Sequence, residues 1–282
     1  MTKHEHTFSL GGQSAWFHEE GFDYGPVHTY DALKVGGPDD LPRKVHVLVP
    51  RDYAESRERY PTFYLNDGQT ALFPGGTMGK CWSIGQTMSA LFAEGKIARS
   101  LIVAVHPLVR DREYTHAQGM PGSQFGGLDD YAGYIAGPLK TFIDKNYRTD
   151  PSAEKSATVG SSHGGLAAFY TACKYPDRFR RAFALSPSFW VGRGDSMSSS
   201  PLVTALRETL IDRTRRPDIW IDWGLIRDGA VRGAREMAAL LQSEFKYELG
   251  RDLWIHEDRE GGHDEESWGR HFGLFSQTLY RP

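Results

Sequence analysis

Short hydrophobic runs alternate with segments of helical periodicity along most of the chain. These runs are apolar throughout or at every second position, and turn-forming residues flank them. They lie at 44–49, 62–65, 101–105, 157–159, 182–185, 219–221 and 253–255. Runs of this length and composition are typical of strands that are buried on both faces of a mainly parallel sheet. We therefore expect each of these segments to form a strand.

The helical period appears between and after these runs. Apolar residues follow the spacing of one helix face at Ala234, Met237, Ala238, Leu241 and Phe245, and similar spacing occurs in 130–145 and 268–279. Gly137 and Pro138 should kink or restart the helix within 130–145. The alternation predicts an α/β fold with a doubly wound, mainly parallel sheet of about eight strands flanked by helices. Ligands of such folds bind at the carboxyl ends of the strands.

Gly-, Pro- and Ser-rich patches separate the periodic segments without dividing the chain. They are short and lie at 36–40, 74–79, 120–127 and 192–201, so we interpret them as loops rather than domain linkers. We expect residues 1–282 to form a single domain. Residues 1–43 carry no motif, and we expect them to be an N-terminal extension or leading strands of the sheet.

Charge and composition narrow the function classes. The 282 residues contain 33 Lys and Arg against 36 Asp and Glu, a net charge of −3, which argues against a nucleic-acid-binding protein. No apolar run approaches the ~18 residues of a membrane span. The first residues lack the pattern of a secretory leader, which favours a cytoplasmic location. Cys81 and Cys173 are too few and too far apart for a disulfide scaffold or a cysteine-built zinc site.

The segment from Gly160 to Gly164 carries the most specific signal. It has the form Gly-x-Ser-x-Gly between an apolar strand and a helix-forming run, which is the setting of a nucleophile elbow. Glycines suit such a sharp turn because the flanking positions tolerate almost no side chain. The turn would expose the hydroxyl of Ser162 and direct the backbone N–H of His163 at a developing oxyanion. Ser161 does not fit, since glycines do not flank it at both sides.

Other interpretations of this glycine-rich segment are weaker. A flexible linker would not lie between a buried strand and a helix. A phosphate-binding turn remains conceivable at a helix N-terminus, but the chain has neither Gly-Lys-Ser/Thr nor Gly-x-Gly-x-x-Gly here.

A serine nucleophile needs a base, and His263 is the candidate. It stands in a Gly-Gly-His loop between the last predicted strand and the last predicted helix, whereas His256 lies in a strand and His271 in a helix. A surface histidine in an acidic loop is the plainer alternative. A metal site formed by His256, Glu257, Asp258, His263 and Asp264 is disfavoured because Gly-Gly breaks any regular ligand spacing. We expect no metal.

The acid and the second oxyanion donor come from loops after strands. Asp228 follows the strand at 219–221 and is the favoured acid, with Asp222 at the strand end as the alternative. Either carboxylate could instead be a solvated charge or a helix cap. The backbone N–H of Gln69, in the loop after 62–65, is the candidate second oxyanion donor.

Several motifs together resemble one family. They are Tyr64-Leu-Asn-Asp-Gly-Gln69, Arg112-Glu-Tyr114, Gly160-Ser-Ser-His-Gly-Gly165, Leu185-Ser-Pro-Ser-Phe-Trp190 and Gly261-Gly-His-Asp264. The set is similar to the putative-esterase group of α/β-hydrolases, which includes enterochelin, salmochelin, fungal siderophore and feruloyl esterases. The resemblance covers roughly residues 44–280. It implies a compact serine esterase that uses Ser162, Asp228 and His263 without a cofactor.

One departure from the family pattern concerns the acid. The family often places it three positions after the strand glycine, where this chain has Arg227, with Asp228 one position later. That shift keeps Asp222 open.

The substrate is expected to be a bulky small-molecule ester. Aromatic and cationic residues near the strand ends could stack on or pair with it, and the candidates are Trp82, His106, Arg110, Arg112 and Trp190. A siderophore ester is the first expectation, and a feruloyl, acetyl-carbohydrate or other carboxylic ester is the alternative. A non-catalytic hydrolase fold that only binds ligands, or an acyltransferase, would carry the same scaffold.

Overall fold

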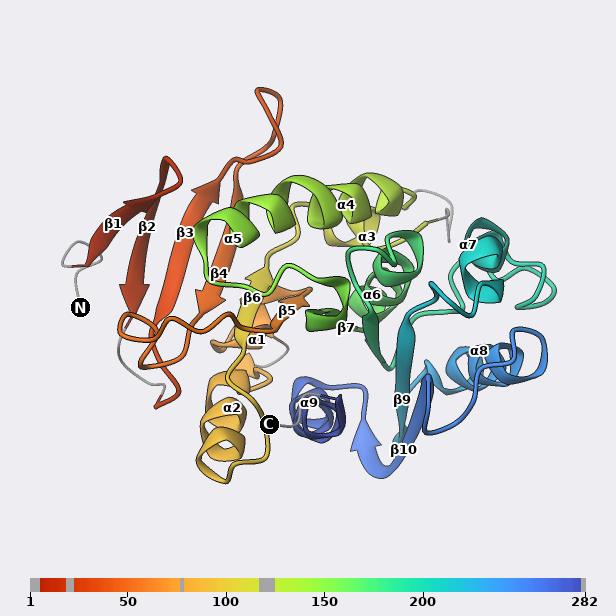
Figure 1. Ribbon diagram of the computed structural model, residues 1–282. Coiled ribbons are helices and arrows are strands. Elements are labelled where there is room, and N and C mark those ends of the chain that lie inside the picture. Colours follow the sequence, from red (N-terminus) through yellow and green to blue (C-terminus); the bar gives the residue numbers. More distant parts are fainter. Residues whose placement is uncertain (1–5, 19–22, 77–78, 117–124, 280–282) are drawn as a thin grey trace.

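The computed structural model describes residues 6–18, 23–76, 79–116 and 125–279. Within these residues, one sheet of ten strands runs in the order β1-β2-β3-β4-β6-β5-β7-β8-β9-β10 (Figure 1). The strands are β1 (Thr7–Leu10), β2 (Gln13–His18), β3 (Val27–Leu33), β4 (Arg43–Leu48), β5 (Thr62–Leu65), β6 (Leu101–Val105), β7 (Ser156–Ser161), β8 (Arg181–Leu185), β9 (Asp218–Ile226) and β10 (Leu253–Gly262).

The sheet has an antiparallel and a parallel half. β1, β2, β3 and β4 pair as an antiparallel series, and β4 pairs antiparallel with β6. From β6 to β10 every pair is parallel. The sheet therefore has ten strands where the sequence predicts about eight, and residues 7–33 contribute β1, β2 and β3 to it.

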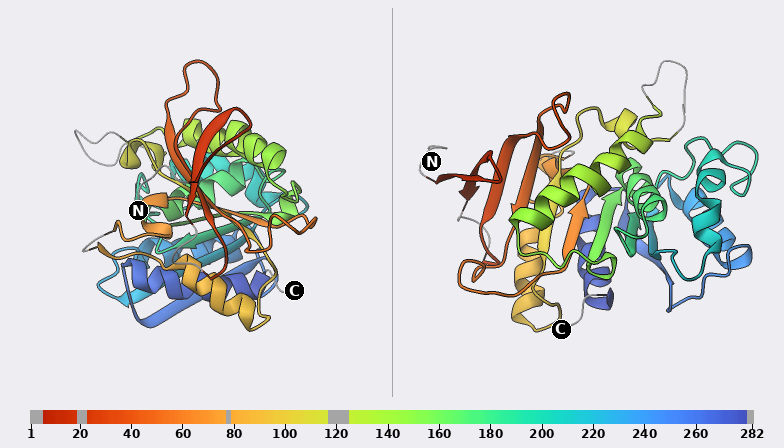
Figure 2. Two further views of the ribbon diagram at one scale, coloured as in Figure 1. Left: turned by 90° about the vertical axis from the view of Figure 1, so that its left-hand side faces the viewer. Right: turned by 45° about the horizontal axis from the view of Figure 1, so that its top comes forward.

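Helices cover both faces of the sheet (Figures 1 and 2). The longer ones are α2 (Ile84–Ala93), α4 (Leu128–Tyr134), α5 (Lys140–Asn146), α6 (His163–Lys174), α7 (Pro201–Ile211), α8 (Val231–Ser243) and α9 (Glu265–Leu279), and the short ones are α1 (Gly68–Ala71) and α3 (Arg110–Glu113). α2 and α9 pack together on one face, and α4, α5 and α6 lie on the other.

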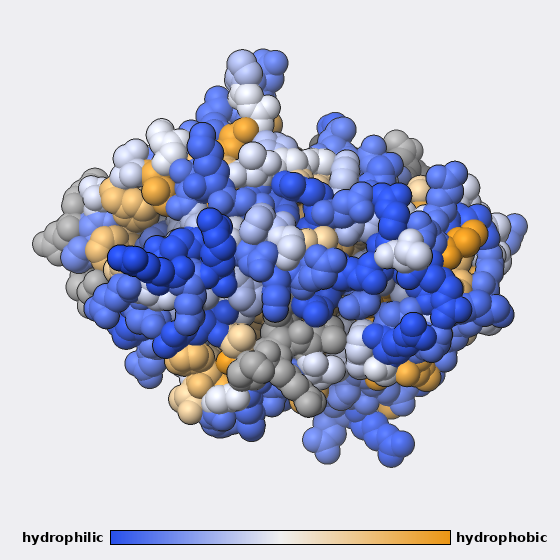
Figure 3. Space-filling model, in the orientation of Figure 1, coloured by the Kyte–Doolittle hydropathy of each residue, from blue (hydrophilic) through white to orange (hydrophobic). Residues whose placement is uncertain are grey.

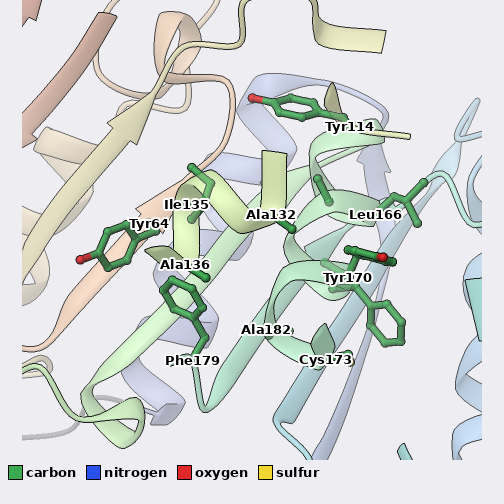
Figure 4. Close-up of a cluster of buried hydrophobic side chains, with 14 of the residues drawn as sticks. Tyr64, Tyr114, Ala132, Ile135, Ala136, Leu166, Tyr170, Cys173, Phe179 and Ala182 are labelled. Atoms are coloured by element: carbon green, nitrogen blue, oxygen red, sulfur yellow. The ribbon is translucent and has the colours of Figure 1, made fainter. Parts of the chain in front are cut away.

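Successive side chains of each parallel strand point to opposite faces of the sheet and so pack into two different cores. On β6, Val103 belongs to the cluster under α4–α6, whereas Ile102 belongs to the cluster under α2 and α9. Figure 4 shows part of the first cluster, in which Ala136 lies beside the ring of Phe179. Burial on both faces explains why these strands read as nearly continuous apolar runs.

The predicted break at Pro138 is present. A π-helical segment, η2 (Ile135–Leu139), contains this proline and joins α4 to α5. Proline has no backbone N–H to donate, so the helix widens locally instead of continuing with its regular bonds.

No helix among the described residues is long and apolar enough to span a membrane. Cys81 and Cys173 are both free thiols. On the face drawn in Figure 3, hydrophilic side chains predominate and apolar ones form small separate patches.

Candidate active site

Ser162 lies at the sharp turn between β7 and α6. Its φ of 56° and ψ of −124° are a strained conformation for a residue other than glycine. A Cβ on Gly160 would meet the carbonyl oxygen of Gly164 at 2.2 Å, and one on Gly164 would meet Oδ2 of Asp67 at 2.9 Å. The turn therefore closes only because these positions lack side chains, as the pentapeptide pattern indicated.

The groups around the Ser162 hydroxyl come from α6 and from the loop after β8. Its Oγ lies 3.5 Å from the Oγ of Ser188, which is itself 2.8 Å from Nδ1 of His163. His163 is the first residue of α6, so its backbone N–H has no carbonyl within the helix to bind. This N–H is therefore available beside Ser162. The side chain of His163 instead lies between the rings of Phe125 and Trp190.

Asp228 and His263 meet at the carboxyl ends of β9 and β10. Nδ1 of His263 lies 2.9 Å from Oδ1 of Asp228, whose side chain is fully buried. The two strands are parallel neighbours, with Gly262 paired to Ile226, so the residues that follow them emerge side by side. β10 extends to Gly262, which makes the loop before His263 shorter than the sequence suggested.

Hydrogen bonds keep the Asp228 carboxylate ionised. Burial alone would raise its pKa, but bonds from His263, Ser186 and the backbone N–H groups of Ala230 and Gly224 outweigh burial and lower the pKa to about 2. An ionised carboxylate accepts the Nδ1 proton of His263, which leaves Nε2 of that ring as a proton acceptor.

The Asp228–His263 pair lies on the same sheet edge as Ser162. β7, β8, β9 and β10 are consecutive parallel strands, so the residues after them share one edge. The pKa of His163 is lowered by burial, then by the Arg110 cation, with a smaller contribution from His263. Ser162, Asp228 and His263 therefore share one edge of the sheet.

Asp222, the alternative acid, faces a different histidine. It is completely buried, and its Oδ2 lies 3.2 Å from Nδ1 of His271 on α9. Its other oxygen accepts the backbone N–H of Ser186 at 3.2 Å. The geometry therefore pairs Asp228, and not Asp222, with His263.

The loop after β5 is held by hydrogen bonds that the sequence did not predict. Asn66 donates to the carbonyl oxygen of Gly164 at 2.8 Å and accepts from the hydroxyl of Tyr131 at 2.6 Å. The backbone N–H of Asp67 donates to the hydroxyl of Tyr114 at 2.9 Å. The Asn-Asp-Gly-Gln motif indicated this loop in the sequence. The contacts of Tyr114 and Tyr131 with it could not be predicted, because both tyrosines come from distant segments.

Gln69 is the second residue of α1. This helix begins directly after Asp67, whose backbone has the left-handed conformation. Nε2 of the Gln69 side chain donates to Oδ1 of Asp67 at 3.0 Å, a hydrogen bond that does not involve the backbone N–H of Gln69. Because α1 has a single turn, its N–H groups lack carbonyl partners within the helix. The N–H of Gln69 is thus available to a ligand. The hydrogen bond from Asn66 to Gly164 holds this loop beside the turn at Ser162.

Two of the proposed binding residues lie near Ser162. Trp190 is 43% exposed, and its ring centroid lies 5.6 Å from that of His163. Arg110 forms two hydrogen bonds with the carboxylate of Asp67, at 2.7 and 2.8 Å. Asp67 therefore largely neutralises the charge of Arg110, and this ion pair helps to hold the loop that carries Gln69.

The other three binding candidates make contacts that do not involve Ser162. Trp82 is 2% exposed and packs against Trp268, so it offers no open face. His106 contacts His46 through Nε2 at 3.0 Å, and burial lowers its pKa to about 4. Arg112 lines a cavity of about 490 Å³ beside Tyr134, whose lining includes neither Ser162 nor the other predicted catalytic residues.

The five residues that the sequence analysis weighed as a metal site do not form one cluster. His263 pairs with Asp228, Glu257 pairs with Arg235, and Asp264 accepts the backbone N–H of Ser267. Only His256 and Asp258 of that set lie together, and they do so with His271.

The fold and this sheet edge define an α/β-hydrolase-like esterase. Residues 40–273 match the model of the family described as "Putative esterase", and the chain belongs to this family. Among curated proteins, Bacillus subtilis YbbA is 23% identical over 153 residues, and an esterase of Mycobacterium tuberculosis is 30% identical over 138 residues. These matches cover 52% and 49% of this chain but 58% and 27% of the relatives, so the chain spans little more than half of the first relative and about a quarter of the second.

Solved structures share the fold at low identity. A ferulic acid esterase has a TM-score of 0.65 at 20% identity, covering 90% of this chain and 98% of its own. The siderophore hydrolase EstA from Aspergillus nidulans has a TM-score of 0.64 at 18% identity, covering 87% and 93%. The enterobactin esterase from Shigella flexneri has a TM-score of 0.66 at 17% identity, covering 90% and 57%.

Proposed function

We propose that this chain is a serine carboxylic-ester hydrolase that works through an acyl-enzyme. Ser162 is the nucleophile, His263 is the general base and acid, and Asp228 orients the imidazole. The backbone N–H groups of His163 and Gln69 form the oxyanion hole. The Asp228–His263 hydrogen bond at 2.9 Å, on the sheet edge where Ser162 turns into α6, carries this proposal.

The reaction follows from these roles. His263 takes the hydroxyl proton as Ser162 attacks the ester carbonyl, and the two N–H groups bind the resulting oxyanion. His263 then gives the proton to the departing alcohol, and an ester bond remains between the acyl group and Ser162. Water repeats the cycle with His263 as its base, which releases the acid and restores the free hydroxyl.

The substrate we propose is a bulky ester, in the first place a siderophore ester. Trp190, Phe125 and His163 form an aromatic group beside Ser162 on which a planar part of a substrate could stack. Arg110 is paired with Asp67, so stacking rather than charge is the main attraction available. Structural neighbours described as a siderophore hydrolase and an enterobactin esterase are consistent with this choice.

A feruloyl ester is the second candidate. The same aromatic group suits a single aryl ring, and a neighbour of similar fold is described as a ferulic acid esterase. The two candidates differ in the size of the molecule beyond the ring.

A substrate panel separates these candidates. Purified chain would be assayed with a trilactone siderophore, an ester-linked hydroxamate siderophore, methyl ferulate and p-nitrophenyl acetate, with Ser162→Ala as the blank. A siderophore ester should give the highest kcat/KM. Activity confined to the ferulate would refute the siderophore assignment and leave the esterase assignment intact. No Ser162-dependent turnover of any ester, together with no labelling of Ser162 by a fluorophosphonate, would favour a non-catalytic binding protein.

A competing alcohol tests for acyl transfer. If the chain is a hydrolase, adding an acceptor alcohol should leave the free acid as the main product. A new ester as the main product would identify an acyltransferase that uses the same residues.

A further inference from the structure

A second histidine–carboxylate cluster lies away from Ser162, at the edge strand β10. His256 and Asp258 are two residues apart on this strand and therefore share a face, and His271 reaches them from α9. One side-chain donor atom from each of the three lies within 4.8 Å of the others. Nothing in the proposed esterase mechanism uses these residues, since Asp228 and His263 pair with each other.

The ring of His271 lies between two carboxylates. Its Nδ1 lies 3.2 Å from Oδ2 of Asp222, and its Nε2 lies 2.9 Å from Oδ2 of Asp258. The ring is 1% exposed and Asp222 is completely buried. A carboxylate behind one ring nitrogen is the arrangement that commonly orients a histidine for metal binding through its other nitrogen.

The other two residues of the cluster are half-buried. His256 is half-buried, its ring centroid lies 4.9 Å from that of His271, and neither of its ring nitrogens has a hydrogen-bond partner among the described residues. Asp258 also accepts the backbone N–H of Glu260 at 3.0 Å and contacts Nη2 of Arg270 at 3.2 Å. The Arg270 side chain is 56% exposed, so it can move aside at little cost.

We propose that His256, Asp258 and His271 bind a divalent transition-metal ion, with Zn²⁺ as the best match. Two imidazoles and one carboxylate are a zinc-type donor set, whereas Ca²⁺ and Mg²⁺ prefer oxygen donors alone. Water would complete the coordination on the solvent side. On binding, Nε2 of His271 gives its proton to solvent and coordinates the ion, while Nδ1 keeps a proton on the side of Asp222.

Such an ion would connect β10 to α9 and so stabilise the fold. Binding to the folded chain alone raises the temperature of unfolding. His256 supplies a ligand without a hydrogen bond to any described residue, so removing it should leave the apo fold unchanged.

Zinc titration of the untagged full chain tests the proposal. By isothermal titration calorimetry at neutral pH, the wild type and Glu257→Gln should bind one equivalent of Zn²⁺. Glu257 is the matched control because it points to the opposite face of β10 and pairs with Arg235 and Trp223. His256→Ala should bind Zn²⁺ at least about tenfold more weakly, and its Tm should no longer rise with Zn²⁺.

Other results would overturn the site. Equal Zn²⁺ affinity in His256→Ala would place the binding at other histidines. Absence of binding to the wild type would leave Asp222, His271 and Asp258 with a purely structural role. Should His256→Ala fail to fold by circular dichroism, Asp258→Asn takes its place with the same expected loss.

Discussion

The imidazole of His263 and the carboxylate of Asp228 are hydrogen bonded at 2.9 Å, although 35 positions separate them in the sequence. The parallel pairing of β9 and β10 brings them together, because it directs both following loops to the same edge. Asp228 is buried and held ionised, so it can orient the ring and stabilise the imidazolium that forms during the reaction. We expect four consequences of this arrangement and of its surroundings.

Asp228→Asn should lower kcat by about 10²–10⁴ with the fold intact. The amide cannot stabilise the imidazolium and favours the wrong tautomer of His263. Asp222→Asn is the matched variant, because Asp222 faces His271 instead. It should lower Tm and leave most of kcat in the protein that remains folded. Steady-state kinetics with thermal melts of both variants checks this, and the opposite ranking of their kcat values would make Asp222 the acid.

Tyr131→Phe should lower both the free energy of unfolding and kcat. The change removes the donor to the buried Oδ1 of Asn66, which costs about 1–3 kcal/mol and loosens the loop carrying Gln69. Tyr134→Phe is the control, because the buried Tyr134 hydroxyl has no hydrogen-bond partner among the described residues. Urea unfolding and kinetics measure both effects. Equal losses in the two variants would show that Asn66 does not depend on Tyr131.

Trp190→Ala should lower kcat/KM for esters with an aromatic acyl group by about 3–10-fold. Stacking beside His163 would be lost, whereas an acetyl group is too small to reach it. Rates with p-nitrophenyl benzoate and p-nitrophenyl acetate test this, since the alcohol is the same. Trp190→Phe should restore most of the loss. An equal decrease for both esters would mean that Trp190 supports the site without binding the acyl group.

The protein should lose stability as the pH falls from 7 to 5. Burial, with His106 and Lys44 nearby, lowers the pKa of His46 to about 3, so the folded state holds this ring neutral. Unfolding lets it take up a proton below its ordinary pKa of about 6.5, and the stabilisation is therefore present above that pH and declines below it.

His46→Gln isolates this contribution. Urea unfolding at pH 7 and pH 5 should show that the wild type loses about 2 kcal/mol more than the variant over this range. Parallel stability curves for the two proteins would mean that His46 is protonated in the folded state.

The fold could be predicted where the determinants are local. Alternating apolar runs predicted the parallel strands, because a strand buried on both faces needs no distant information to be recognised. The glycines around Ser162 likewise predicted the turn that the structure contains. The individual strands within residues 7–33 could not be located from the sequence, because they lie at the exposed end of the sheet, where polar residues interrupt the pattern.

The surroundings of the site depended on pairings between distant segments. The sequence could not show that Arg110 is bound to Asp67, or that Tyr131 reaches Asn66, because 43 and 65 positions separate the partners. Trp82 looked like a substrate-binding residue, yet its burial against Trp268 follows from the packing of α9. The choice between Asp228 and Asp222 likewise required knowing which histidine each carboxylate faces.

The most direct test of the proposed mechanism is whether Ser162 is chemically activated. A fluorophosphonate probe followed by peptide mass spectrometry should modify the wild type at Ser162 alone. Labelling should disappear in Ser162→Ala, persist in Ser161→Ala and slow by orders of magnitude in His263→Ala. A folded wild type that resists the probe, or labelling that survives in Ser162→Ala, would contradict the assignment of this serine as the nucleophile.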